Sequence, residues 1–440
     1  MSKKPSTVSM RDEILEEERR YLFPSVNHMY DDPIVMEEGK GVWVRDHDGR
    51  EYLDFFSGIL TTSLGHCHPR VEERVTAQMK RLGHTSTLYA NAPQAEAAHL
   101  LADIAPGDLS QTFYTNSGTE AIETAIALAC VATGRREIVA LRLAYHGRSS
   151  LATSVAGHSG WRPLAATHPG ITHALSPYPY RCPFKSPCDD SCVDKFAQDL
   201  EEVILTTTNG QPAAFIAETI QGVGGYVVPP PGYFQRAAEI IRKHGGLFIC
   251  DEVQTGFGRT GKWFGIEHWD VVPDIMVMAK GIAAGFPVGA TITRPEIAAV
   301  WKGKTISTFG GNPISMAAHI AALEVMAEEN APQNAKDRGR ELVAGMEALA
   351  GEHPWIGEVR GKGLILAMEL VEDPATKKHS PQRAKALLEA AKVEGLLLGL
   401  SGLFDNVVRV APSLLVTADE SQEALDRLGR ACALVSRETP

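Results

Sequence analysis

Short apolar runs of strand length alternate with longer helical stretches over residues 66–310. The strand-like runs cover residues 112–115, 137–141, 213–217, 247–250, 275–278 and 288–293, and clear helical stretches cover 120–132 and 233–243. Runs of four to six residues rich in Val, Ile and Phe are typical of strands buried on both faces. Alternation of β and α segments therefore predicts an α/β lobe built on a largely parallel sheet.

The two ends of the chain follow other patterns. After a charged helical stretch, residues 41–45 and 51–56 predict a hairpin around an Asp-Gly turn. A long helical stretch at 314–329 is expected to bridge to a C-terminal lobe. That lobe combines helices with strand-like runs at 363–370 and within 396–410.

Residues 160–195 are rich in proline, tyrosine and cysteine, which predicts a long loop or insertion on the main lobe. Cys182, Cys188 and Cys192 loosely resemble metal ligands. Their spacing contains no CxxC pair, and the sequence offers no obvious fourth ligand. We therefore favour a cysteine-rich loop and expect no metal.

Composition narrows the class of protein. The 440 residues are 44% hydrophobic and 22% charged, ordinary values for a globular chain that is too long for one small core. A net charge of −11 without any basic run argues against nucleic acid or anionic lipid as a partner. Seven cysteines, an acidic N-terminus without a signal-like apolar region, and no long uncharged apolar stretch make a cytoplasmic, reducing setting the expectation.

Lys280 and Asp251 carry the first chemical signal, because each directly follows an apolar strand-like run. Ligands of open α/β sheets bind outside the carboxyl ends of the strands, so the two side chains are expected to share one crevice. A lysine there can form a Schiff base, and an aspartate can keep a pyridinium nitrogen protonated, which is the working pair of a pyridoxal-phosphate enzyme. On the pair alone, a solvated lysine beside an unrelated acid is an equally good interpretation.

Residues 116–120 follow a strand and open a helix. Ser117 and Thr119 offer hydroxyls, Gly118 allows close approach of the backbone, and the helix N-terminus favours an anion. These features predict a phosphate site. Ordinary helix capping by Ser117 is the alternative.

Residues 251–256 give the strongest local signal. Beyond Asp251, Val253 can pack on the face of a cofactor ring and Gln254 can reach its phenolic oxygen. Tyr145, which precedes His146 after the neighbouring strand, can stack on a flat cofactor. The alternatives are an acidic N-cap with a turn for the first motif and a core tyrosine for the second.

Arg409 lies between valines in a strand-like run, so it is expected to be half-buried and to need a partner. A guanidinium fork binds a carboxylate through two parallel hydrogen bonds, whereas an internal salt bridge is the alternative. Thr308 begins a glycine-rich turn that can offer donors to an anion, although a simple loop explains the same residues.

Together these residues resemble the fold-type I, class III pyridoxal-phosphate-dependent aminotransferases over nearly the whole chain. The most specific segments are 248–261, then 273–281 with Lys280, and 65–69. Segments 52–59 and 220–223 are most similar to the mitochondrial-type alanine–glyoxylate branch of that family.

The resemblance implies pyridoxal 5′-phosphate on Lys280 and a homodimer or higher homo-oligomer with shared active sites. Thr308 would reach the phosphate in the neighbouring subunit, Arg409 would hold the substrate α-carboxylate, and Glu218 would belong to the cofactor site. The implied domains are residues 1–65 as the N-terminal part of a small α+β domain, 66–312 as the large cofactor-binding domain, and 313–440 as a linker helix with the rest of the small domain.

The implied activity is transfer of an amino group from an alanine-type donor to a small 2-oxo acid such as glyoxylate or pyruvate. Val223 stands where ω-amino branches carry a glutamate that shields the carboxylate-binding arginine, and Ile59 stands where dialkylglycine decarboxylases carry a glutamine. The alternatives are a 4-aminobutyrate or other ω-amino acid transaminase, a 2,2-dialkylglycine decarboxylase, a phospho-lyase, and a non-catalytic binding protein with the same fold.

Overall fold

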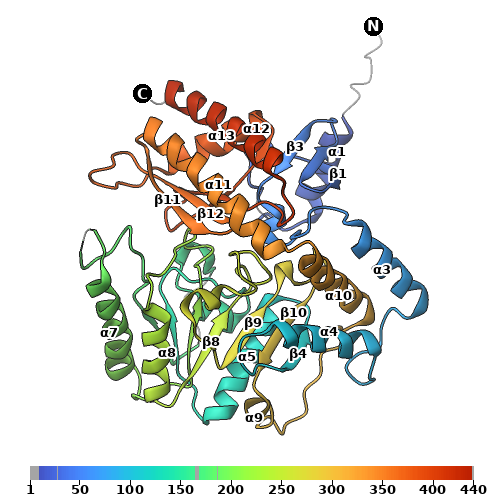
Figure 1. Ribbon diagram of the computed structural model, residues 1–440, viewed down its shortest axis with the longest axis vertical. Helices are drawn as coiled ribbons and strands as arrows, with labels where there is room; N and C mark the ends of the chain where they lie inside the picture. Colours follow the sequence, from blue (N-terminus) through green and yellow to red (C-terminus); the bar gives the residue numbers. More distant parts are fainter. Residues whose placement is uncertain (1–8, 27, 164–167, 186, 439–440) are drawn as a thin grey trace.

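A seven-stranded sheet forms the centre of the larger lobe in the computed structural model, which describes residues 9–26, 28–163, 168–185 and 187–438 (Figure 1). Its spatial order is β4 (Gln111–Thr115), β10 (Gly289–Thr293), β9 (Ile275–Met278), β8 (Leu247–Asp251), β7 (Ala214–Glu218), β5 (Ile138–Leu141) and β6 (Ile171–Ala174). Strand β10 is antiparallel to both of its neighbours, and the pairs from β9 through β6 are parallel. The predicted α/β architecture with a mostly parallel sheet is confirmed.

Alternate residues of the central strands enter different cores, because successive side chains of a strand point to opposite faces. Ile249 of β8 packs in the core beneath α5 (Gly118–Thr133), whereas Phe248 and Cys250 pack in the core that includes α8 (Tyr233–Lys243). Helices on both faces explain why these strands are apolar throughout instead of alternating. Further helices of this lobe are α3 (Pro69–Arg81), α4 (Ala92–Ile104), α6 (Ser150–Val155), α7 (Asp190–Thr207) and α9 (Pro295–Ala298).

Two smaller sheets lie beside this lobe (Figure 1). One contains β1 (Met36–Lys40), β2 (Trp43–Asp46), β3 (Glu51–Asp54) and β13 (Leu396–Leu397); the other contains β11 (Ile356–Lys362), β12 (Ile365–Leu370), β15 (Val407–Val410) and β14 (Gly399–Ser401). The predicted hairpin is present as β2 and β3. Because β13 pairs with β3, segments from the two ends of the chain share one sheet.

Helix α10 (Pro313–Glu328) connects the two parts of the molecule, and it corresponds to the predicted bridging helix. Most of its side chains are buried on every side, as expected for a helix between packed layers. Helices α1 (Met10–Tyr21), α2 (Ser57–Leu60), α11 (Ala331–Glu352), α12 (Pro381–Val393) and α13 (Ala418–Glu438) complete the small-sheet part. The division at residues 65 and 312 stays a prediction.

The prediction of one long loop over residues 160–195 is wrong in part. Strand β6 lies within this segment, and α7 begins at Asp190. The strand was hard to recognise because it is an edge strand, with neighbours on one side only and the mixed sequence Ile-Thr-His-Ala. Residues 164–167 and 186 of this segment, and residues 1–8 of the N-terminal stretch, lie outside the described residues. Among the helices that are described, none is long and apolar enough to cross a bilayer.

Candidate active site

Lys280 and Asp251 lie at the same edge of the large sheet. Asp251 is the last residue of β8, and Lys280 follows the adjacent parallel strand β9. Both residues line a cavity of about 310 Å³, a size suited to a small molecule. The sequence-predicted residues that line the same cavity are Ser117, Gly118, Thr119, Tyr145, His146, Glu218, Val253 and Gln254.

Lys280 is held in an unusual local environment. Its backbone has a φ of 48°, in the left-handed region that costs energy for a residue with a side chain. Desolvation lowers the pKa of its amine, and the charges of Asp251 and Glu218 offset part of that effect. A lysine with a lowered pKa is available as a neutral nucleophile and base.

Asp251 forms a buried pair with His146. Its Oδ2 lies 2.7 Å from His146 Nδ1, and its Oδ1 accepts a hydrogen bond of 3.0 Å from the backbone N–H of Val253. Burial lowers the pKa of the His146 imidazole, but the hydrogen bond and charge of Asp251 outweigh burial, so that pKa lies above its ordinary value. The Asp251 carboxylate and the His146 imidazole therefore form a hydrogen-bonded pair that holds both side chains in place on the cavity wall.

Glu218 ends β7 and is the register partner of Asp251. Its carboxylate accepts hydrogen bonds from the backbone N–H groups of Tyr145, at 2.9 Å, and Gly222, at 2.8 Å. Burial is the main cause that raises its pKa to about 7. Through these two hydrogen bonds Glu218 holds the loop at Tyr145 and the loop at Gly222 in place, and its side chain also lines the cavity.

The start of α5 lines the cavity with residues of a kind that suit an anion. Ser117 caps the helix by accepting a hydrogen bond of 3.2 Å from the N–H of Glu120, so the capping interpretation is confirmed. The same residue also lines the cavity, and the first-turn amides of a helix are free to bind an anion. A side chain at Gly147 would lie 2.6 Å from Thr119 Oγ1, so only glycine permits the approach of these two segments.

The lining groups fit pyridoxal phosphate. Within the described part of the chain, His146 Nε2 and Gln254 Oε1 are buried without a hydrogen-bond partner, although both residues line the cavity. Buried polar atoms normally have partners, so these two atoms indicate a polar ligand. A flat ring between Tyr145 and Val253, with a phosphate at Ser117, would satisfy this arrangement.

Arg409 is buried in β15 beside the cavity, close enough that its charge further lowers the pKa of Lys280. Its guanidinium lies 4.6 Å from the Phe56 ring centre and 5.5 Å from the Tyr226 ring centre. Nη2 donates a hydrogen bond of 2.9 Å to the carbonyl of Leu400, while Nε is buried without a partner. Among the described residues, Arg409 forms no ion pair, so the internal salt-bridge interpretation is wrong.

Thr308 is exposed and does not line the cavity of its own chain. It lies in the turn before α10, next to residues 84–91. Ser307 N–H donates to Thr87 Oγ1 at 3.3 Å, and the His84 and Phe309 rings lie 5.1 Å apart. The structure therefore places Thr308 on a surface, away from the other predicted site residues.

Sequence reasoning missed several lining residues, namely Thr61, Arg148, Ile220 and residues 285–288. The last group joins β9 to β10. Its Gly-Phe-Pro sequence is a turn signal, and its place just after Lys280 could have assigned it to the same edge of the sheet. Thr61 and Ile220 had no comparable signal, because the fold alone brings them to the cavity.

Comparisons with known proteins agree with this geometry. The family model of class-III aminotransferases matches residues 25–432. The mitochondrial alanine–glyoxylate aminotransferase 2 homolog 2 of Arabidopsis thaliana is 43% identical over 426 residues, covering 96% of this chain and 88% of the relative. An acetylornithine aminotransferase of Methanopyrus kandleri is 39% identical over 401 residues, covering 91% and 94%. A solved amine transaminase from an uncultivated Pseudomonas species, in its PLP-bound form, superposes with a TM-score of 0.88 at 30% identity, covering 94% and 98%.

Proposed function

The chain belongs to the class-III aminotransferases, which are pyridoxal-phosphate-dependent transaminases, and on that premise we propose that it moves an amino group from an alanine-type donor to glyoxylate or pyruvate. The observation that supports this choice is Arg409, a buried guanidinium beside Lys280 that has no acidic partner within the described ranges of the chain. Such a group favours substrates that carry a carboxylate next to the reacting amine. The Arabidopsis relative is named as an alanine–glyoxylate aminotransferase, which is an activity of the same kind.

Each residue has a defined task in this proposal. The bound cofactor supplies an electron sink for the carbanion that forms when Cα loses its proton. Lys280, with its lowered pKa, takes that proton as a general base and returns it as a general acid. Asp251, held by His146, would place its negative charge at the ring nitrogen of the bound cofactor. Arg409 holds the α-carboxylate and thereby orients the bond to the departing proton.

Val223 supports a short α-amino donor. Its carbonyl accepts a hydrogen bond of 2.9 Å from the N–H of Gly402, next to the hairpin that carries Arg409. Its aliphatic side chain cannot neutralise the arginine. Arg409 is thus available to bind an α-carboxylate in both half-reactions. An ω-amino donor has no carboxylate next to its reacting amine, so it needs the charge of Arg409 to be shielded when it binds.

The rival functions predict different products. Ile59 has no hydrogen-bonding group for a decarboxylation site, and it is about half exposed. One relative is named an acetylornithine aminotransferase and one solved structure an amine transaminase. Donors whose amine is distant from a carboxylate, or that have no carboxylate, are therefore the alternative substrates. The assembled Lys280, Asp251 and Gln254 argue against a non-catalytic binding protein.

A half-reaction screen tests the proposal. Purified holoenzyme is mixed, without acceptor, with a panel of α-amino acids, ω-amino acids and simple amines, and cofactor absorbance and keto acid are followed. We expect alanine to give one pyruvate per active site. Release of CO₂ or phosphate would favour a decarboxylase or a phospho-lyase, and no reaction with any amine would favour a binding protein.

Arg409→Ala should weaken α-amino and α-keto acids far more than amines that lack a carboxylate. Loss of a partly desolvated, charge-assisted pair is expected to cost about 2–5 kcal/mol in kcat/KM. The measurement compares alanine with a simple primary amine in the wild type and the variant, so the amine serves as the control. Equal losses for both substrates would identify Arg409 as a folding residue.

Alanine should exceed 4-aminobutyrate in kcat/KM against a common acceptor. Val223→Glu should shift the preference toward 4-aminobutyrate, because the new carboxylate can neutralise Arg409. Val223→Gln is the matched control, with a similar size and no charge, and should not shift it. A tenfold preference of the wild type for 4-aminobutyrate, roughly 1.4 kcal/mol, would reject the alanine-type assignment.

A homodimer with shared active sites is also part of the proposal. Large apolar side chains are exposed around Thr308, namely Leu88, Tyr89, Ile306 and Phe309, each at least 60% exposed. A second copy covering them would remove this apolar surface from water and bring Thr308 to the partner's phosphate site. The cytoplasmic location stays a prediction, and the Arabidopsis relative is named as mitochondrial.

A further inference from the structure

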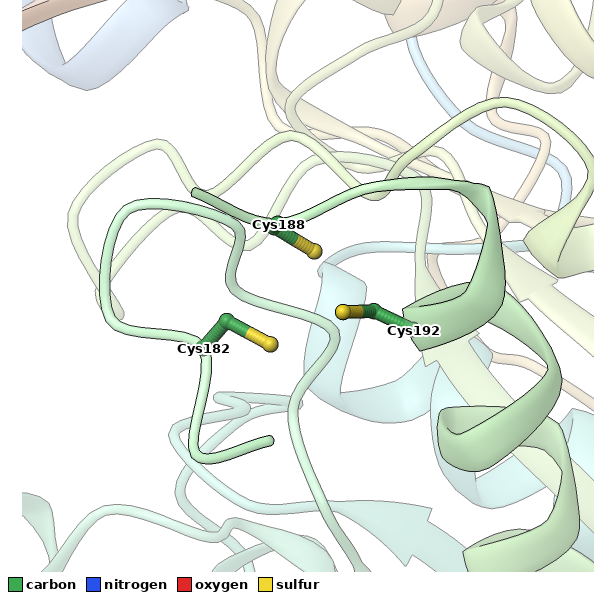
Figure 2. Close-up of side chains that lie close together, drawn as sticks. All are labelled: Cys182, Cys188 and Cys192. Carbon is green, nitrogen blue, oxygen red and sulfur yellow. The ribbon is translucent and has the colours of Figure 1, made fainter. Parts of the chain in front are cut away.

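Three cysteines that the activity does not use converge beside the N-terminus of α7. Cys182 and Cys188 come from the preceding loop, and Cys192 lies in the first turn of the helix. Figure 2 shows their side chains pointing toward one another. The three Sγ atoms all lie within 4.8 Å of each other, and Cys192 is fully buried.

We propose that Cys182, Cys188 and Cys192 form a zinc site. Zinc binds thiolates at about 2.3 Å, so three sulfurs around one tetrahedral ion lie about 3.8 Å apart. The observed separations need to close by about 1 Å at most to meet that requirement. Three thiolates are soft ligands, which favour zinc over magnesium or calcium.

The triangular arrangement favours a metal over a disulfide. A disulfide brings two sulfurs to about 2.05 Å and leaves the third without a partner. Here each sulfur is near both of the others, and all seven cysteines are free thiols. One ion at the centre accounts for the position of all three.

The surrounding backbone suits negatively charged sulfur. The amides of Phe184 and Lys185 donate hydrogen bonds to the Cys182 sulfur, the kind of outer contact that orients metal ligands. Cys192 is held in place by the first turn of the 18-residue helix α7. In the described part of the chain the mutually close group contains only the three cysteines, and Asp189 Oδ1 lies 3.8 Å from Cys192 Sγ, so that carboxylate or a water molecule would take the remaining position.

The ion would fasten the loop that braces the small-sheet part of the molecule. Upstream of Cys182, the Tyr178 hydroxyl donates to the Glu369 carboxylate, and Arg181 Nε lies 2.5 Å from the same carboxylate. Glu369 belongs to β12, which pairs with the strand that carries Arg409. Zinc would thereby stabilise the region behind the carboxylate-binding arginine without touching substrate.

The test measures metal in the full-length holoenzyme. The protein is expressed in medium that contains zinc and is then dialysed. Inductively coupled plasma mass spectrometry measures its zinc content, and X-ray absorption measures the coordination of the bound zinc. We expect about one zinc per chain with three sulfur neighbours at about 2.3 Å. Cys188→Ser should reduce zinc at least tenfold, whereas Cys130→Ala, which alters a half-buried cysteine of α5, should retain it.

The X-ray absorption result on the wild type stands even if a cysteine variant fails to fold. No bound zinc, zinc with oxygen and nitrogen neighbours only, or equal zinc in the wild type and Cys188→Ser would overturn the proposal. Loss of two thiol hydrogens in the intact mass of the wild type would overturn it in favour of a disulfide.

Discussion

Lys280→Ala is expected to reduce transamination by about 10⁴-fold or more while the fold persists. Proton transfer by a positioned side chain is typically worth about 10²–10⁴-fold, and in the proposed function Lys280 also supplies the covalent link to the cofactor. The side chain lines a cavity, so we expect its truncation to enlarge that cavity and to leave the fold in place. Steady-state turnover of alanine with glyoxylate measures the loss, and circular dichroism checks the fold.

Lys302→Ala is the matched control, because Lys302 is an exposed lysine distant from the cavity lining. It should keep wild-type turnover. Borohydride reduction should attach the cofactor to the wild type and to Lys302→Ala but not to Lys280→Ala. Turnover of Lys280→Ala within tenfold of the wild type would remove Lys280 from the mechanism.

Asp251→Asn is expected to lower kcat by about 10²–10⁴-fold and to change the absorption spectrum of the bound cofactor. Removing the carboxylate leaves His146 without the charge that raises its pKa, and an amide cannot stabilise a protonated ring nitrogen. Removing one preorganised electrostatic group from an active site typically lowers kcat by about 10²–10³-fold, or about 2.7–4 kcal/mol, which lies within the expected range.

Asp274→Asn provides the control for a buried, paired aspartate. Asp274 precedes β9 at the opposite edge of the sheet, where it contacts Arg242 and Arg294. Its replacement should lower the melting temperature without altering the cofactor spectrum. If Asp251→Asn behaves in the same way, with near-normal kinetics, Asp251 is a structural residue.

The central strands were predictable because burial on both faces leaves a continuous apolar run. Strands β8 and β9 coincide with the predicted runs almost residue for residue, and helix α8 matches its predicted range. The place of Lys280 and Asp251 followed from strand polarity, since the carboxyl ends of parallel strands meet at one edge. Strand β6 was missed because it lies at the edge of the sheet, where fewer of its side chains are buried, so its sequence is not a continuous apolar run.

The sequence by itself determined the α/β class and the cavity-lining residues that directly follow strands, because apolar periodicity and polar strand ends are local properties. Only the tertiary structure decided which distant segments meet. It left Arg409 without an acidic partner among the residues that the structure describes, placed Thr308 on the surface, and gathered Cys182, Cys188 and Cys192 despite a spacing that indicated no metal. The physical reason is that side-chain contacts across a fold depend on how whole elements pack, which no single window of sequence encodes.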